Sequence, residues 1–294
     1  MMLNDIKTVS KTNAENKLFS ILIPTWNNHS YLKLVMDSLR KNSHFPHQFI
    51  VAVNEGLDGS LDWIREQTDI DYIHAPYNIG ICCAMNACRK LIRTEYAVYA
   101  NDDMYFLPGW DLSLKKEIDR IGHKGFMLSS TAIEPRGAER GIIADYGTEA
   151  ADFREKELLH DYQSLKQADW SGSTFPPNII HVDLWDLVGG FSLEFNPGMY
   201  SDPDLSKKLW EAGVRTFIGK GDSLVYHFAC KTTGRIKKND GRKTFLMKWG
   251  LSSKKFIFSH LRLWQAARPV LPDTTLSLGE RWLQRLKRLV VCLK

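Results

Sequence analysis

Residues 96–103 have the sequence Tyr-Ala-Val-Tyr-Ala-Asn-Asp-Asp, in which an apolar run passes directly into amide and acidic side chains. The apolar part is short and contains valine and tyrosine, which is typical of a buried strand. Asn101, Asp102 and Asp103 stand where that strand ends. Because two adjacent carboxylates repel each other unless a cation neutralises them, the stretch indicates a divalent-metal site. Taken alone, it also fits an ordinary Asp-rich turn.

Three earlier apolar runs alternate with segments whose apolar residues recur at helical spacing. The runs, residues 19–23, 49–53 and 71–74, predict further buried strands. The first helical segment has apolar residues at Leu32, Val35, Met36 and Leu39. This alternation predicts an α/β, Rossmann-like fold with a mostly parallel central sheet and helices on both faces. Such sheets bind ligands at the carboxyl ends of their strands, so the polar clusters there are expected to meet at one edge.

The chain divides into three parts by composition. Residues 1–18 are polar and patternless, which predicts a flexible N-terminal arm. Residues 19–240 carry the strand and helix pattern, and residues 241–294 form a basic, tryptophan-containing extension expected to be helical. Near its end, apolar residues lie on one side of a helix and basic residues occupy much of the rest. Such a helix either lies on an anionic membrane surface or docks on its own domain, and both readings stay open.

The formal charge of +5 over 294 residues is mild. It suits an acidic ligand such as a diphosphate, and it is too small and too spread to indicate nucleic-acid binding. The five cysteines form no Cys-x-x-Cys pair, so neither a disulfide framework nor a zinc site is expected, and a reducing cytosol fits best. No signal peptide or membrane-spanning run is apparent. We therefore expect a cytoplasmic protein, peripheral on the cytoplasmic face of the inner membrane if its last helix binds lipid.

Several short motifs follow one another along the chain in an order that resembles family 2 glycosyltransferases of the GT-A fold. They are Ser-Ile-Leu-Ile-Pro-Thr-Trp-Asn at 20–27, Val-Asn-Glu-Gly-Leu-Asp-Gly-Ser at 53–60, Asn-Ile-Gly at 78–80, Asn-Asp-Asp at 101–103, Pro-Gly-Trp at 108–110, Gly-Gly-Phe at 189–191 and Ser-Asp-Pro-Asp-Leu at 201–205. Each motif is weak alone, whereas the series in this order is specific. The resemblance covers roughly residues 19–235.

The resemblance implies an inverting glycosyltransferase that uses a nucleotide-sugar donor, UDP-, dTDP- or GDP-linked, and Mn²⁺ or Mg²⁺. The acceptor would be a hydroxyl of a glycan or a lipid-linked glycan, and the usual setting is cell-surface polysaccharide or lipopolysaccharide synthesis. It also assigns residues to the donor and metal. Those assigned to the donor are Pro24, Thr25, Asn27, Glu55, Asn78, Gly80, Asn101 and Asp102. Asp103 and His227 are assigned to the metal, although a histidine at a strand end is also a common structural feature.

Asp202 is the residue expected to act as catalytic base. An inverting displacement needs one carboxylate to take the proton from the attacking acceptor hydroxyl. Asp204 is the alternative, and an aspartate at a helix start is also a routine cap. The chain departs from the family pattern at Met85, where arginine is frequent, and at Ser201, where glutamate is usual. These departures bear on the identity of the donor and on the strength of metal binding.

Two other functions compete with this interpretation. A sugar-nucleotide pyrophosphorylase would have a glycine-rich basic loop after the first strand, whereas residues 24–27 contain neither glycine nor lysine. A catalytically inactive GT-A module that only binds or scaffolds is disfavoured by the retained aspartates. Among the aromatic residues, Trp170 in the loop at 169–173 is the strongest candidate for contact with the acceptor sugar.

Overall fold

The computed structural model of the chain describes residues 5–13, 15–136, 141–228, 235 and 239–292. Over these residues a single sheet forms the centre, with strands in the order β1-β4-β3-β2-β5-β10-β7-β11-β6, while β8 pairs with β7 and β9 with β11. The strands are β1 (Lys7–Val9), β2 (Phe19–Trp26), β3 (Gln48–Asn54), β4 (Ile70–Ala75), β5 (Tyr96–Tyr99), β6 (Met104–Phe106), β7 (Phe126–Glu134), β8 (Gly141–Ile143), β9 (Trp170–Ser171), β10 (Asn178–His181) and β11 (Thr216–His227).

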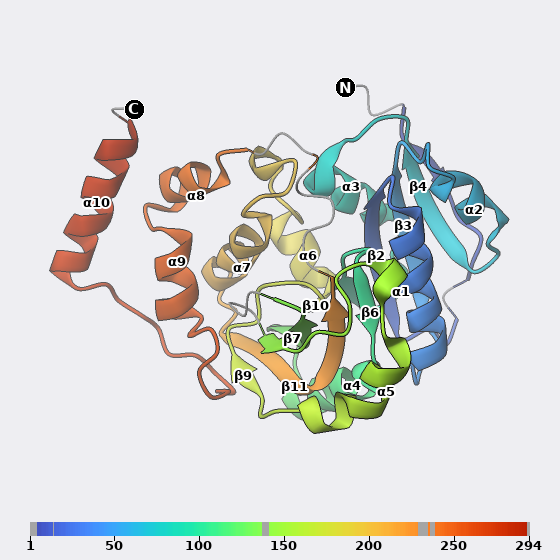
Figure 1. Cartoon of the computed structure of the whole chain (residues 1–294). Helices are drawn as coiled ribbons and strands as arrows, with labels where there is room; N and C mark the ends of the chain where they lie inside the picture. The colour runs from blue at the N-terminus through green and yellow to red at the C-terminus, as the bar shows by residue number, and fades with distance from the viewer. Residues whose placement is uncertain (1–4, 14, 137–140, 229–234, 236–238, 293–294) are drawn as a thin grey trace.

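Helices cover both faces of this sheet (Figure 1). They are α1 (His29–Asn42), α2 (Ser60–Glu66), α3 (Gly80–Cys88), α4 (Trp110–Ile121), α5 (Glu155–Asp161), α6 (Val182–Val188), α7 (Ser201–Glu211), α8 (Gly241–Trp249), α9 (Ser253–Lys255) and α10 (Leu278–Cys292), with short turns η2 (Arg89–Leu91), η3 (Ala150–Asp152), η4 (Tyr162–Leu165), η5 (Leu193–Phe195) and the π-helix η6 (Phe256–His260). Side chains alternate along a strand, so Ile21 and Ile23 pack with α1, α2 and α4, whereas Leu22 packs with α3, α6 and α7.

The predicted α/β class is confirmed, and parallel pairing occurs in both halves of the sheet, since β7 pairs parallel with β11 and β8 in the second half. Strands β4, β3, β2 and β5 are parallel neighbours, whereas β10 runs antiparallel between β5 and β7. One boundary differs from the prediction, because β2 does not end at residue 23. It continues through Pro24 and Thr25, and Trp26 still pairs with Asn54 of β3. Thr25 therefore sits on a rigid strand end and not on a loop.

The prediction of a flexible arm over residues 1–18 is wrong for the part that forms β1 and the residues after it. Lys7–Val9 pairs antiparallel with β4. The Lys11 ammonium donates to carbonyls at the end of α2, including that of Arg65 at 2.8 Å. The backbone N–H groups of Lys11 and Thr12 donate to the buried Asp71 carboxylate at 2.6 and 2.9 Å. A three-residue edge strand is too short to be recognised from the periodicity of its sequence. Residues 1–4 and 14 of the predicted arm lie outside the described ranges.

The predicted boundary at residue 241 does not separate two bodies. Phe245, Phe256, Leu261 and Leu271 are buried in the same core as α3 and α7. Strand β9 also forms a bridge from Trp170 to Ala266. Residues 241–276 thus complete the main domain, and α10 alone stands out from it as an extension (Figure 1). Among the helices described, none is both long enough and apolar enough to cross a bilayer.

Candidate active site

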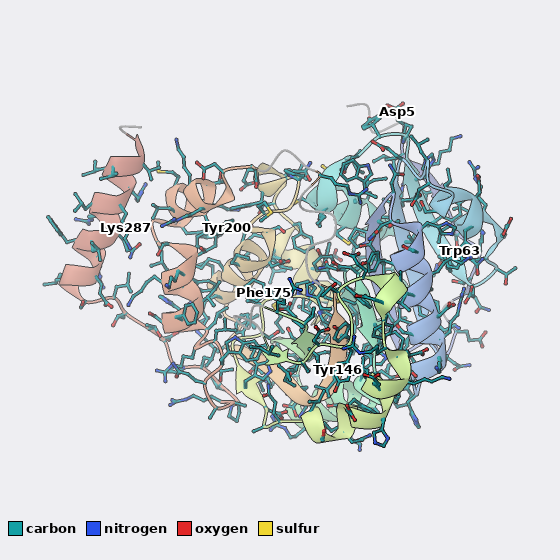
Figure 2. All side chains as sticks on the ribbon, viewed as in Figure 1. Asp5, Trp63, Tyr146, Phe175, Tyr200 and Lys287 are labelled. Carbon is teal, nitrogen blue, oxygen red and sulfur yellow. The ribbon has the colours of Figure 1, made fainter. Side chains whose placement is uncertain are left out.

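A cavity of about 780 Å³ opens at the carboxyl ends of the parallel strands. This size is typical of small-molecule sites. The structure brings nine of the eleven predicted site residues to its wall: Pro24, Thr25, Asn78, Gly80, Asn101, Asp102, Asp103, Asp202 and His227. Figure 2 labels Phe175 and Tyr200, two aromatic residues that also line the cavity.

The other two predicted residues, Asn27 and Glu55, do not line the cavity. The Asn27 amide donates to Glu55 Oε2 at 2.8 Å, and its oxygen accepts from the backbone N–H groups of Gly56 and Leu57 at 3.1 and 2.8 Å. Asn27 and Glu55 both have positive φ, 46° and 60°. Their contacts hold the segment after β2 against the turn after β3. A direct contact with the nucleotide remains a prediction for both residues.

Three strand ends bring together a carboxylate, an imidazole and a second carboxylate. His227 at the end of β11 lies 3.3 Å from Asp103 Oδ1 through Nε2, and 2.7 Å from Glu134 Oε1 through Nδ1. The antiparallel pairing of β11 with β6 sets this arrangement, because it places His227 opposite Met104. The Phe228 N–H also donates to the Asp103 carbonyl at 3.1 Å. All three side chains are buried. Sequence reasoning missed Glu134, although the apolar residues that precede it in β7 (Phe126–Glu134) place it at a strand end.

The electrostatics of this group suit a cation. Burial alone would lower the pKa of His227, but the negative charges of Asp103 and Glu134 outweigh burial and raise that pKa to about 10. Burial and the neighbouring charge of Asp103 raise the pKa of Asp102 well above its ordinary value. Negative charge is therefore crowded at one end of the cavity, which a bound cation would relieve.

The residues present fit a divalent cation whose remaining coordination positions are filled by the phosphates of a bound substrate. In the described part of the chain, no group of three or more His, Cys, Asp or Glu side chains could hold a metal by itself. Asp103 offers one oxygen, and His227 offers a facing nitrogen once a bound cation displaces the proton from its imidazole; Glu134 orients the far nitrogen of the ring. Mg²⁺ and related ions are commonly bound by one or two protein groups together with substrate phosphates. Asp103 and His227 are the pair that would hold it.

The Asn-Ile-Gly turn joins the sheet to the segment before Asp202. Ile79 donates its N–H to Asn54 Oδ1 at 3.0 Å, and its carbonyl accepts from the Asn196 amide at 2.7 Å. Gly80 has a φ of 75°, and a Cβ there would lie 2.2 Å from the Asn196 side chain. Only glycine fits this contact. Asn54 thus ties this turn to the end of β3.

The structure separates the two candidate bases, Asp202 and Asp204. Asp204 is fully buried, and its carboxylate accepts hydrogen bonds from Ser192 Oγ at 2.6 Å and Trp249 Nε1 at 2.8 Å and pairs with Lys248 at 3.0 Å. Asp204 therefore anchors α7 to its neighbours and does not reach the cavity. Asp202 lies on the cavity wall at the first turn of α7. Of the two carboxylates, Asp202 alone is positioned to meet a ligand.

The opposite wall of the cavity is aromatic and apolar. Trp170 and Trp264 have ring centroids 4.0 Å apart, and both line the cavity. Trp264 comes from the C-terminal segment, where Arg262 and Trp264 both adopt positive φ, 56° and 64°. The Trp264 N–H donates to the Ser171 carbonyl at 3.1 Å. Sequence reasoning found Trp170 but not Trp264, because their contact spans more than ninety residues and no local signal predicts it.

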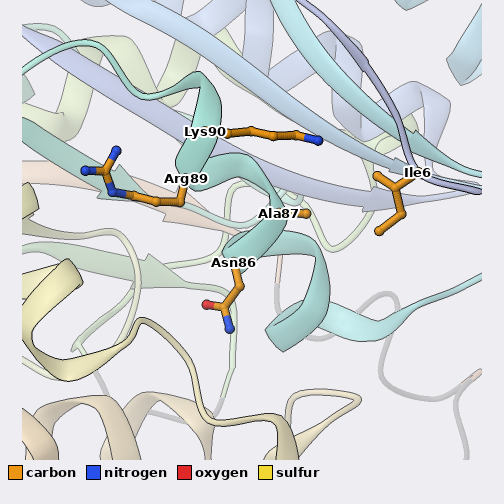
Figure 3. Close-up of a pocket in the computed structure, with 5 residues that line it drawn as sticks. All are labelled: Ile6, Asn86, Ala87, Arg89 and Lys90. Carbon is orange, nitrogen blue, oxygen red and sulfur yellow. The ribbon is translucent and has the colours of Figure 1, made fainter. Parts of the chain in front are cut away.

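A second hollow, of about 440 Å³, lies beside the end of α3 and is lined by Ile6, Asn86, Ala87, Arg89 and Lys90 (Figure 3). Its main polar groups are already used within the protein. The Asn86 amide bonds both the N–H and the carbonyl of Phe191, at 2.8 and 2.7 Å, and Arg89 pairs with Asp186 at 2.5 Å. This hollow is therefore a weaker candidate than the large cavity.

Comparison with known proteins agrees with the motif series. Residues 20–171 match the family described as glycosyl transferase family 2. An uncharacterized glycosyltransferase of Mycoplasma genitalium is 25% identical over 173 residues, which is 51% of this chain. The match covers 57% of that relative's length.

Solved structures show the same fold at low sequence identity. GalNAc-T7 with UDP, GalNAc and Mn²⁺ has a TM-score of 0.58 and 13% identity, over 83% of this chain and 50% of that one. TarS 1–349 of S. aureus, in complex with UDP-GlcNAc, has a TM-score of 0.53 and 12% identity, over 93% of this chain and 72% of that one. The likeness supports the architecture around the cavity.

Proposed function

The chain belongs to glycosyl transferase family 2, and we propose that it is an inverting, metal-dependent transferase that moves a sugar from a nucleotide-sugar donor to an acceptor hydroxyl. The observation that carries this proposal is the single cavity that holds the Asp103–His227 pair at one end and Asp202 on its wall. The donor diphosphate belongs beside Asp103 and His227. The nucleotide belongs beside Thr25 and Asn78, on strand and turn residues of the same wall.

The reaction we propose is a direct displacement. The acceptor oxygen attacks the anomeric carbon, Asp202 takes the hydroxyl proton, and the bond from that carbon to the diphosphate oxygen breaks. Asp103 and His227 would hold Mn²⁺ or Mg²⁺, which stabilises the negative charge that grows on the departing diphosphate. A base on the face opposite the leaving group yields inversion. The GalNAc-T7 structure contains UDP and Mn²⁺, which supports the choice of a UDP-linked donor and of this metal class.

The acceptor half of the cavity favours a carbohydrate. Aromatic rings stack on the apolar face of a sugar, and Trp264 lines the same cavity as Asp202, so we assign Trp264 to the acceptor sugar. We propose a glycan or lipid-linked glycan as acceptor, in cell-surface polysaccharide or lipopolysaccharide synthesis at the cytoplasmic face of the inner membrane. The free thiols of Cys82, Cys83 and Cys88 agree with a reducing compartment. A pyrophosphorylase is disfavoured by the family match, and an inactive module is tested by the experiments below.

A thermal-shift screen of nucleotide-sugars, with and without Mn²⁺, tests the proposed donor and metal. A ligand at a hundred times its Kd stabilises the folded state by about 2.7 kcal/mol. For a chain of this size, that raises the Tm by roughly 4–5 °C. We expect this rise for one donor with Mn²⁺ or Mg²⁺, and a much smaller rise when EDTA replaces the metal. If no nucleotide-sugar shifts the Tm with either metal, the proposed donor chemistry is wrong.

Removal of Trp264 should weaken the acceptor and spare the donor. Aromatic contacts contribute about 0.5–1.5 kcal/mol beyond simple burial, so Trp264→Ala should raise the acceptor KM by roughly tenfold. Trp264→Phe should have an acceptor KM close to that of the wild type. The measurement is transfer to a panel of p-nitrophenyl glycosides, with Trp282→Ala on α10 as the matched control. A rise in donor KM instead would place Trp264 at the wrong end of the cavity.

A further inference from the structure

Helix α10 contacts the domain through its polar side. Of its residues with described side chains, Gln284 alone is buried, at 3% exposure, and its Oε1 accepts from the Ser252 N–H at 3.0 Å. One turn earlier, Glu280 pairs with Lys255. Both contacts fall on one stripe of the helix, because residues four apart lie on the same face. The side of α10 that docks on the domain is therefore hydrophilic.

The apolar side of α10 faces away from the domain. Trp282 is 65% exposed and Leu289 is 61% exposed, and the remaining exposed apolar residues of the helix are Leu278, Leu283, Leu286 and Val290. At 100° per residue, Trp282, Leu286 and Leu289 point nearly opposite to Gln284. An ordinary docked helix would have the reverse orientation. The docked-helix reading of the sequence therefore does not explain the apolar face of α10.

Basic residues flank this apolar face. Arg281, Arg285 and Lys287 lie on α10 between the apolar stripe and the docked stripe, Arg288 lies one turn after Gln284 on the docked side, and all four are exposed. The excess of basic residues extends over the whole C-terminal segment. Residues 241–294 contain twelve Lys and Arg residues and two Asp and Glu residues, which gives a formal charge of +10. Residues 1–240 contain 27 Lys and Arg residues and 32 Asp and Glu residues, which gives a formal charge of −5. The cationic character of the chain is thus concentrated in the segment that carries α10.

The segment that anchors α10 also forms part of the cavity wall. Ser252 and Lys255, which bind Gln284 and Glu280, belong to the same turn of chain as Lys254 and Phe258, and the latter two line the cavity. Figure 1 shows α10 beside α8 and α9, on the outer edge of the molecule. A surface bound by α10 would therefore lie next to the elements that shape the acceptor half of the cavity.

We propose that α10 docks the protein on an anionic lipid surface, with its apolar face in the interface and its arginine and lysine side chains against lipid phosphates. A basic amphipathic helix with an exposed apolar stripe has the properties of helices that lie in the plane of a bilayer. A nucleic acid would neutralise the charge but leave the apolar face uncovered. A second copy that paired through this face would bring the flanking arginines of two helices together.

The test is sedimentation of the full chain with vesicles of phosphatidylglycerol and phosphatidylcholine, compared with pure phosphatidylcholine vesicles. We expect binding to the anionic vesicles that weakens steeply as salt is raised. The double variant Leu286→Asp/Leu289→Asp should lower the bound fraction at least tenfold. Leu187→Asp/Leu193→Asp is the matched control, because these exposed leucines lie outside α10, and it should bind as the wild type does. Arg281→Gln/Arg285→Gln, which removes two charges from one flank of the apolar face, should weaken binding to anionic vesicles severalfold.

Two outcomes would overturn the proposal. Equal sedimentation of the wild type and the α10 double variant would remove the apolar face as the contact. A dimer in light scattering that becomes a monomer in the double variant, without any vesicle binding by the wild type, would assign the face to a second copy. The thermal shift with nucleotide-sugar and Mn²⁺ reports separately on the folded cavity. It should be unchanged in every α10 variant.

Discussion

Asp202→Asn should lower kcat by about 10²–10⁴-fold and leave the donor Kd close to that of the wild type. The substitution keeps the size and much of the hydrogen bonding of the side chain at the first turn of α7. It removes the charge that would accept the proton of the acceptor hydroxyl. Loss confined to kcat is the signature of an interaction made only in the transition state. Initial rates of transfer and calorimetric titration with the donor measure the two quantities separately.

Asp204→Asn is the matched control, because the same change is made two residues away on the same helix. Asp204 is fully buried and its carboxylate is taken up by Ser192, Lys248 and Trp249. Its replacement should cost about 1–3 kcal/mol of folding free energy and leave kcat nearly unchanged below the lowered Tm. Transfer by Asp202→Asn within threefold of the wild-type rate would remove Asp202 as the base.

Asp103→Ala should abolish metal-dependent binding of the donor. The substitution deletes one of the two protein groups that face each other across 3.3 Å at the acidic end of the cavity. The donor would then lose the cation that compensates the crowded negative charge of Asp102, Glu134 and the diphosphate. Donor titrations with Mn²⁺ and with EDTA should give the same weak affinity in the variant. Electron paramagnetic resonance of free Mn²⁺ should report no metal taken up with the donor.

Glu134→Gln should weaken metal binding less than Asp103→Ala does. Glu134 does not face the cation but bonds the far nitrogen of His227 at 2.7 Å. Partners of this kind typically change metal affinity by about 10–100-fold. The expected order of Mn²⁺ affinity is wild type, then Glu134→Gln, then Asp103→Ala. Unaltered donor affinity and Mn²⁺ uptake in Asp103→Ala would show that this pair does not hold the metal.

Features that depend on neighbours in the chain were predicted well. The strands at 19–23, 49–53, 71–74 and 96–100 were each recognised from a short buried run between helical segments, and their order predicted the α/β sheet. The ends of these strands then predicted which polar clusters would meet. Pro24, Thr25 and residues 101–103 lie on one cavity for this reason, whereas the other predicted residues on its wall, Asn78, Gly80, Asp202 and His227, were assigned from the family resemblance. Edge strands such as β1 and β6 escaped notice because three residues carry too little pattern.

The sequence by itself determined the fold class, the edge of the sheet where the cavity opens, and the acidic residues at that edge, because strand and helix periodicity and strand-end residues are local properties. Only the tertiary structure showed that Asp202 lines the cavity and Asp204 does not, joined Glu134 to His227, and brought Trp264 onto Trp170. It also decided which side of α10 meets the domain. These features depend on contacts between segments far apart in the chain, whose pairing is set by packing and not by any local pattern.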